Sequence, residues 1–462
     1  MNVDILGLNS SHWPKQSLLI WIILGLALIV GIGSLAGGIY IEISRVGAVL
    51  ALLLLVLFEL RDGHKRFLTS PLFLLSTIGI LFFSVAQGIW APEPPWPDTT
   101  RNFSLYVGSQ AEAIILVFCM VGLVFYQFTS GIVAPSKSPE ITELPNYVIF
   151  GLFMLALSIS IFDVVLYSLK ADMPPIYAKV HFVVPALLIL SLSLLIRNSL
   201  ICGSYYKIGL FLFSILVLGN LAYVGESKIV VFIMTSLLLY SFRIFSFSFR
   251  HLILVLLASV LVVLALIQVI QQTRWKVSGS MQSEQISTNY SRIFQGKGVW
   301  RQLETGYCLG NVVKSHANQP FDASKQNFWI IGLVPRVLWP DKPSLSLGKV
   351  YAVKYCSKLP HEVGHHSSSI TVLGQPLIHG GIFGLIIHAG LLLFALAGIE
   401  KLNANRSALS TCLVVALLPW LIDFDQDFAM YLANAVKFAL VMLILFIPIV
   451  LIERRDINRH LA

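Results

Sequence analysis

Apolar stretches long enough to cross a membrane recur along almost the whole chain. A membrane helix needs about 20 apolar residues, because each residue adds about 1.5 Å and the hydrocarbon layer is about 30 Å thick. The pattern therefore predicts an all-α, polytopic membrane protein with about twelve transmembrane helices. The predicted spans are 17–41, 44–60, 70–90, 105–133, 146–168, 178–196, 206–224, 229–246, 251–270, 373–398, 407–424 and 428–452.

One long polar segment interrupts this pattern, between residues 271 and 372. It is far longer than a helix connection needs, and such loops are usually functional or disordered. The chain therefore divides into transmembrane helices over 1–270, a large loop over 271–372, and three more helices with a tail over 373–462. Within the loop, residues 290–313 mix charged and aromatic side chains, so we expect structure there. Residues 328–334 are apolar enough to lie against the membrane surface.

The composition and the distribution of charge agree with a membrane protein. The chain is 56% hydrophobic and 12% charged, and its mean hydropathy of +0.81 excludes a soluble globule. The net charge of +9 does not indicate nucleic acid as a partner, because the cations follow the membrane topology. With a cytoplasmic N-terminus, the inside segments carry 14 Lys and Arg and the short outside loops carry five. This bias predicts that both termini are cytoplasmic and that the large loop is extracytoplasmic.

Two of the five cysteines, Cys308 and Cys356, lie in the large loop. An oxidising periplasm would allow them to form a disulfide. The sequence leaves open whether they pair or remain thiols.

Cations in the outside segments are candidates to bind a lipid-linked pyrophosphate. Arg offers phosphate oxygens a planar fork of donors. Arg336 and Lys342 stand between prolines in residues 335–343 (PRVLWPDKP), and prolines restrict the backbone there. The alternative for each cation is that it is solvated or binds anionic lipid headgroups. The candidates are Arg274, Arg292, Arg301, Arg336, Lys342 and Lys228.

Glycosyl transfer from such a lipid also needs a group that takes the proton of the acceptor hydroxyl. Asp341 has the alternative of pairing with Arg336 or capping a turn. Glu304 has the alternative of pairing with Arg301, three residues before it on a helix. The candidates for the base are Glu304, Asp341, His365, His366 and His379.

Residues 361–365 (HEVGH) match the pattern in which two histidines on one helical face bind zinc. The pattern requires a helix, whereas Pro360 precedes it and Gly364 lies within it. We therefore expect no metal site.

Charged residues inside the predicted spans must face partners or water, because they are costly in lipid. They are Glu112, Asp163 and Lys437. A transporter would use them for ion coupling, whereas a structural interpretation pairs Glu112 with Lys437. The turn 423–427 carries three aspartates, which could hold an acceptor or a cation or form a solvent-exposed loop.

The motif 335–343, together with residues 368–371 (SSIT) and Gly374, Gly381 and Gly384 after it, resembles bacterial O-antigen polymerases of the Wzy type. The layout is similar as well, with about twelve spans and one large extracytoplasmic loop near the C-terminal end. Residues 225–228 (GESK) look like a variant of the Gly-Ser-Arg turn found before a span in these proteins, with Lys228 in place of Arg.

The resemblance implies a membrane-embedded, metal-independent glycosyltransferase of the GT-C type, without a cofactor. It would act at the periplasmic face of the bacterial inner membrane. The donor would be a glycan on undecaprenyl pyrophosphate, transferred en bloc to a sugar hydroxyl of a new lipid-linked repeat unit. Membrane lipid and a protein that regulates chain length would be the other partners.

The same resemblance suggests roles for the candidate residues. Arg336, Arg301 and Arg274 would hold the pyrophosphate, and Lys342 would assist them or position Asp341. Glu304 and His379 would be the candidates for the base.

Two other functions remain open. An O-antigen ligase shares the layout and favours a loop centred on histidine, as His361, His365 and His366 would allow. A secondary transporter or flippase of polysaccharide precursors would have internal repeats and helices broken at mid-membrane. Inspection of the sequence reveals neither feature.

Overall fold

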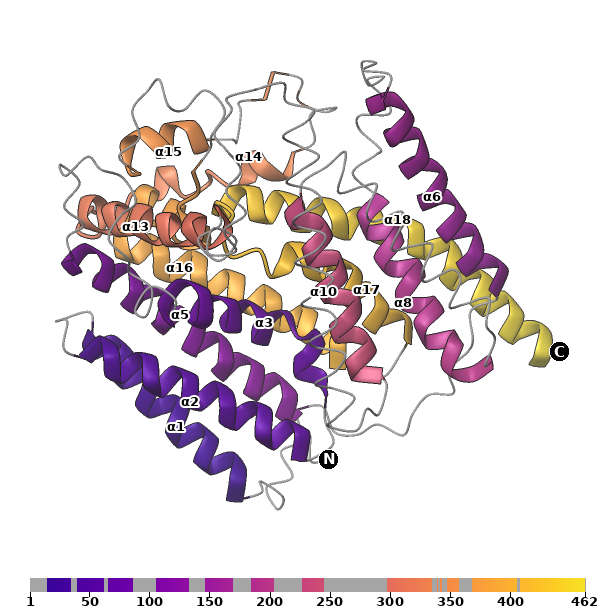
Figure 1. Ribbon diagram of the computed structural model, residues 1–462, viewed down its shortest axis with the longest axis horizontal. Helices are drawn as coiled ribbons and strands as arrows, with labels where there is room; N and C mark the ends of the chain where they lie inside the picture. The colour runs from indigo at the N-terminus through magenta and orange to yellow at the C-terminus, as the bar shows by residue number, and fades with distance from the viewer. Residues whose placement is uncertain are drawn as a thin grey trace, which may run out of the picture.

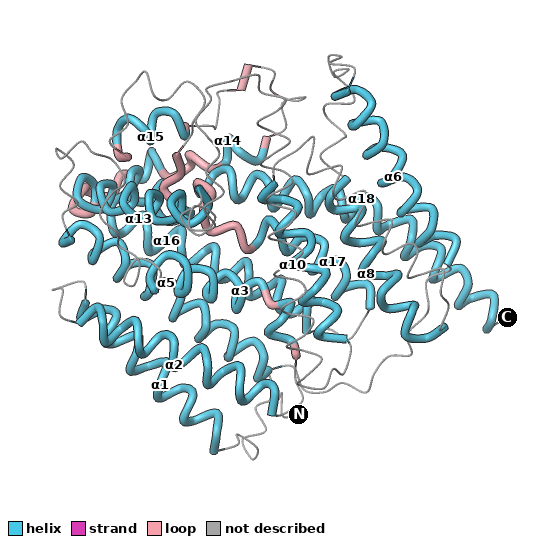
Figure 2. The backbone as a smooth tube through the Cα atoms, in the orientation of Figure 1, coloured by secondary structure: helices cyan, strands magenta, loops and turns pink. Residues whose placement is uncertain are grey.

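In the computed structural model, the part of the chain that the structure describes is helical throughout, with no strand. Figure 2 shows the described residues as helices with a few loops and turns. The described residues are 15–34, 40–61, 65–85, 105–132, 146–168, 184–202, 227–244, 297–334, 339, 341–342, 347–356, 368–404 and 408–461.

The N-terminal helices form one side of the bundle (Figure 1). Helix α1 (Lys15–Ser34) packs on α2 (Tyr40–Arg61) and on α5 (Leu105–Ile132). Helix α3 (Pro71–Ile78) also packs on α5 and continues as a π-helical turn, η2 (Gly79–Val85). Two local signals start α3. The Ser70 hydroxyl accepts a hydrogen bond from the Phe73 amide, and Pro71 occupies the first helical position.

The central helices connect the two halves of the sequence. Helix α6 (Asn146–Ser168) packs on α8 (Val184–Cys202), and α8 packs on α10 (Ser227–Ile244) and α17 (Ala408–Leu421). The C-terminal part of the chain therefore contributes to the same bundle as the middle part.

The large loop contains helices that pack on the bundle (Figure 1). Helix α13 (Lys297–His316) lies against α5 and α16 (Thr371–Ala404). Helix α13 confirms the expectation of structure for residues 297–313, whereas residues 290–296 lie outside the described set. A 3-10 turn, η4 (Ala323–Lys325), and helix α15 (Gly348–Lys354) follow in the same loop. Helix α14 (Ile330–Leu333) packs on α18 (Phe428–Leu461).

The lengths and compositions of these helices support a helical membrane protein. Three stretches are long and apolar enough to span a membrane: Ile41–Leu60, Gln110–Thr129 and Thr371–Asn403. Shorter apolar helices coincide with other predicted spans. The predicted spans 206–224 and 251–270 lie outside the described residues.

Arg45 is a charged residue near the start of a long apolar helix. It lies within α2, in the apolar stretch Ile41–Leu60. Its guanidinium binds both carboxylate oxygens of Glu112 on α5, and the two side chains are 16% and 3% exposed. The ion pair explains why a helix can continue through Arg45, since a buried charge is tolerated when it is paired.

The ion-pair partner that the structure gives Glu112 is thus Arg45 of α2. The Lys437 ammonium lies 5.9 Å from the ring centroid of Phe438. Asp163 is on α6, and its side chain is outside the described set.

Candidate functional site

Helix α16 is broken at Gly380 and Gly381. Gly381 has φ of +59° and ψ of −154°, a conformation that strongly favours glycine. A turn of the large loop docks at this break. The Ile382 amide donates to the Ala317 carbonyl over 3.3 Å, and a Cβ at Gly381 would lie 2.3 Å from the Gln319 oxygen. The sequence inspection missed this broken helix because nothing in the local sequence reveals the docked turn.

His379 stands directly before the break and is half-buried. Its ring lies face to face with Phe328, with 4.3 Å between centroids and 8° between planes. Its carbonyl accepts a hydrogen bond of 3.0 Å from the Gln326 amide, which also donates to the Asp322 carbonyl over 2.7 Å. The large loop therefore holds both the ring and the backbone of His379.

The ring nitrogens distinguish His379 from the other two histidines whose side chains the structure describes. In His316, the ring nitrogen Nδ1 lies 2.8 Å from Gln319 Oε1, and Nε2 lies 2.8 Å from the Tyr355 hydroxyl. In His388, Nδ1 lies 2.8 Å from the Gly384 carbonyl, and Nε2 lies 3.3 Å from the Gln326 carbonyl. Within the described residues, no group hydrogen-bonds to either ring nitrogen of His379.

Lys342 of the cationic motif binds the backbone of the segment that follows Phe328. The Lys342 ammonium donates to the carbonyls of Gly332 and Val334, over 3.1 and 2.8 Å. These bonds tie Lys342 to the end of α14, which begins two residues after Phe328. Asp341, its neighbour in the chain, is exposed.

The remaining predicted site residues are only partly covered by the structure. Arg301 and Glu304 lie on α13 and Lys228 lies on α10, but their side chains are outside the described set. Residues outside the described ranges are Arg274, Arg292, Arg336, His361, His365 and His366.

The three aspartates that precede α18 are buried, so a solvent-exposed turn is the wrong interpretation. Asp423, Asp425 and Asp427 are only 5%, 6% and 8% exposed. The turn folds against the start of α16, where the Val372 amide donates to the Phe424 carbonyl over 3.3 Å. From the sequence, three aspartates at alternate positions between two apolar helices do not by themselves predict burial.

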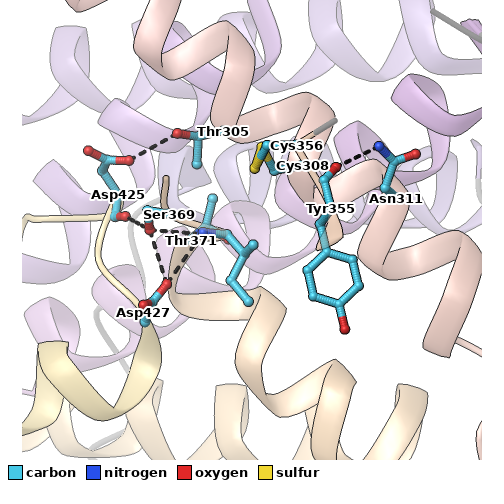
Figure 3. The surroundings of a disulfide bond; sticks show 10 residues. Thr305, Cys308, Asn311, Tyr355, Cys356, Ser369, Thr371, Asp425 and Asp427 are labelled. Atoms are coloured by element: carbon cyan, nitrogen blue, oxygen red, sulfur yellow. Dashed lines mark hydrogen bonds between the residues drawn. A yellow bond between two sulfur atoms is a disulfide. The ribbon is translucent and has the colours of Figure 1, made fainter. Parts of the chain in front are cut away.

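Hydroxyl groups from separate elements meet these carboxylates (Figure 3). Thr305 on α13 donates to Asp425 Oδ1 over 3.1 Å. Ser369 donates to the Asp425 carbonyl and lies 3.2 Å from Asp427 Oδ1. Thr371, which begins α16, has a φ of +65°. This buried junction ties α13, α16 and the turn before α18 together.

Asp427 can exchange a proton near neutral pH. Burial raises the pKa of its carboxyl to about 7, and the charge of Asp425 acts in the same direction. The Ile370 amide and the Ser369 hydroxyl lower this pKa but do not offset burial. A carboxyl with such a pKa is suited to acid–base chemistry. Asp427 precedes α18 and meets the start of α16, roughly 12 Å along that helix from His379.

Cys308 and Cys356 form a disulfide, which settles the alternative that the sequence leaves open. The bond joins α13 to the end of α15 (Figure 3). Asn311 reinforces it by donating to the Tyr355 carbonyl over 2.7 Å. The loop helices are therefore held together on the bundle.

Within the described ranges, no group of three or more His, Cys, Asp or Glu residues is placed to hold a metal ion. The zinc-like pattern at 361–365 lies outside those ranges. No protein-family model, curated protein or solved structure matches the chain.

Proposed function

We propose that this protein is a polysaccharide polymerase that transfers a glycan from undecaprenyl pyrophosphate to a lipid-linked repeat unit. In this proposal it is a GT-C-type glycosyltransferase with about twelve spans in the bacterial inner membrane. Both termini are cytoplasmic, and the large loop and the active site are periplasmic. The helical bundle and the distribution of cations support this arrangement.

One observation carries the proposal. Lys342 of the cationic motif binds the carbonyls of Gly332 and Val334, and Phe328, in the same segment, stacks on His379. In this proposal the motif binds phosphate, and His379, whose ring nitrogens no described residue engages, is the base. A transferase that acts on a lipid pyrophosphate needs both groups in one place.

The chemistry follows from these groups. His379 takes the proton of the acceptor hydroxyl while the hydroxyl oxygen bonds to the anomeric carbon of the donor. The bond between that carbon and the pyrophosphate oxygen breaks, and the polyprenyl pyrophosphate leaves with the electron pair. Arg336, aided by Arg301 and Arg274, stabilises the charge that develops on the leaving group. Loss of one such Arg is expected to lower the rate on the order of 100-fold.

The length of α16 supports a position of its break at one face of the membrane. Between Gly381 and Glu400 the helix rises roughly 29 Å, close to the thickness of the hydrocarbon layer. At the far end, Glu400 accepts hydrogen bonds from Ser70 and Asn403, over 2.7 and 3.0 Å, and Arg243 donates to the Asn403 carbonyl over 3.0 Å. In this proposal His379 lies at the periplasmic face, where a water-soluble glycan can reach it.

The second candidate is a transporter or flippase of polysaccharide precursors. The broken helix and the buried charged network around Glu400 favour it, because transporters use both features. Transporter helices are broken near the midplane, however, whereas the stretch after Gly381 is long enough to cross the bilayer by itself. This favours the polymerase.

The test is to delete the gene in its host and to separate the surface glycan on a gel. Complementation would use the wild type, Arg336→Ala and, as a matched control, Lys354→Ala, an exposed loop cation outside the motif. A polymerase predicts loss of the ladder with one repeat unit still attached, no rescue by Arg336→Ala, and rescue by the control. Long lipid-linked chains without attachment would indicate a ligase. Accumulation of repeat units on the cytoplasmic face would indicate a flippase.

A further inference from the structure

The orientation of His379 depends on a segment that is remote in sequence. Phe328 comes from the large loop, between η4 and α14, and it is 9% exposed. Its ring contacts His379 in parallel and also contacts His388 and Phe428, at centroid distances of 5.2 and 5.9 Å. Packing against His388 and Phe428 therefore fixes the position of the Phe328 ring independently of its contact with His379.

The usual means of orienting a catalytic histidine is a carboxylate that accepts a hydrogen bond from one ring nitrogen. No described residue plays that part here, since neither ring nitrogen of His379 has a hydrogen-bond partner in the described residues. The titratable groups that act on His379 are His388 of α16, Lys325 of η4 and His316 of α13, and none of them is a carboxylate.

We infer that Phe328 and Gln326 are the positioning residues of His379, an inference that rests on the proposed function. Phe328 holds the plane of the imidazole by face-to-face stacking, and Gln326 holds the backbone by donating to the His379 carbonyl. Both ring nitrogens then remain available, one to accept the proton of the acceptor hydroxyl.

The glycines at the break make this arrangement possible. A Cβ at Gly380 would lie 2.7 Å from the Gln326 amide nitrogen, so only a glycine lets the Gln326 side chain reach the His379 carbonyl without a shift. The same pair of glycines, Gly380 and Gly381, therefore allows both the break in α16 and the contact that positions His379.

The test compares Phe328→Leu, which removes the flat ring, with Phe328→Tyr, which keeps it. Phe321→Leu, at an exposed aromatic of the same loop, is the matched control. The first readout is the rate at which diethyl pyrocarbonate modifies His379, followed by mass spectrometry across pH 5–8. His316, held by Tyr355 and Gln319, is the internal reference. This readout does not require activity.

The second readout is chain growth on lipid-linked repeat units, normalised to the amount of folded protein in size-exclusion chromatography. We expect Phe328→Leu to change the modification rate of His379 several-fold, with His316 unchanged, and to lower kcat about 10- to 100-fold with little change in KM. Phe328→Tyr and Phe321→Leu should retain activity. An unaltered modification profile, or an altered profile with normal kcat, would overturn the inference. Absence of chain growth by the wild type would instead refute the proposed function, and the modification data would still report whether Phe328 orients His379.

Discussion

The Ser369 hydroxyl lies 3.2 Å from Oδ1 of Asp427 and links the start of α16 to the turn before α18. The Ile370 amide approaches the same oxygen, at 3.4 Å. Two donors thus converge on one buried carboxylate oxygen, and the ionisation of Asp427 must influence how tightly these helix ends are held together.

The stability of the protein should depend on pH through Asp427. Its pKa is about 7 in the folded state, whereas an aspartate in an unfolded chain titrates near 4. Between these values the folded protein holds more protons than the unfolded chain, so the free energy of unfolding falls as the pH rises from about 4 to about 7. The loss amounts to at most about 4 kcal/mol. Apparent Tm in detergent at a series of pH values measures it.

Asp427→Asn isolates this effect, because an Asn oxygen still accepts from Ser369 and Ile370 but does not ionise. We expect the variant to match the wild type near pH 4 and to melt at a higher temperature at pH 8. Asp341→Asn, at an exposed carboxylate, is the control and should leave the pH profile unchanged. A wild-type profile in Asp427→Asn would show that another group causes the dependence.

Gly381→Ala should destabilise the protein by at least about 1–3 kcal/mol. The residue has a positive φ, and the new Cβ would lie 2.3 Å from the Gln319 oxygen. Gly390→Ala is the matched control on the same helix, because a Cβ there meets nothing within 4 Å. It should be neutral or stabilise by about 0.5–1 kcal/mol. Equal melting temperatures for the two variants would contradict the break in α16.

Breaking the ion pair between Arg45 and Glu112 should destabilise the contact of α2 with α5. Arg45→Ala leaves a buried carboxylate without its guanidinium, which typically costs about 3–5 kcal/mol. The double variant Arg45→Met/Glu112→Leu removes both charges and should recover much of the loss. A double-mutant cycle on apparent Tm measures the coupling, and strictly additive effects would refute the pair.

Removing the disulfide should loosen α15 from α13. The bond closes a loop with a sequence separation of 48 residues. Loop entropy predicts a loss of about 4 kcal/mol when both cysteines become serine. Reductant should lower the melting temperature of the wild type but not that of the Cys308→Ser/Cys356→Ser variant. Insensitivity of both to reductant would mean that no disulfide forms.

Hydrophobic patterning predicted the positions of several of the described helices. The predicted spans 105–133 and 146–168 became Leu105–Ile132 and Asn146–Ser168, because an apolar run of that length has one stable conformation in lipid. The same pattern indicated a membrane protein and isolated the large loop. It did not reveal the partner of Arg45, since a window of hydropathy cannot detect a charge that a distant Glu112 neutralises.

Only the tertiary structure decided how the site is assembled. The stacking of Phe328 on His379, the docking of a loop turn at Gly381 and the burial of Asp427 all join residues tens of positions apart. Local sequence specifies the conformation of a helix, because helical hydrogen bonds connect residues four apart. Burial, the pKa of a carboxyl and the orientation of an imidazole depend on which other segments pack against them, and those contacts exist only in the folded chain.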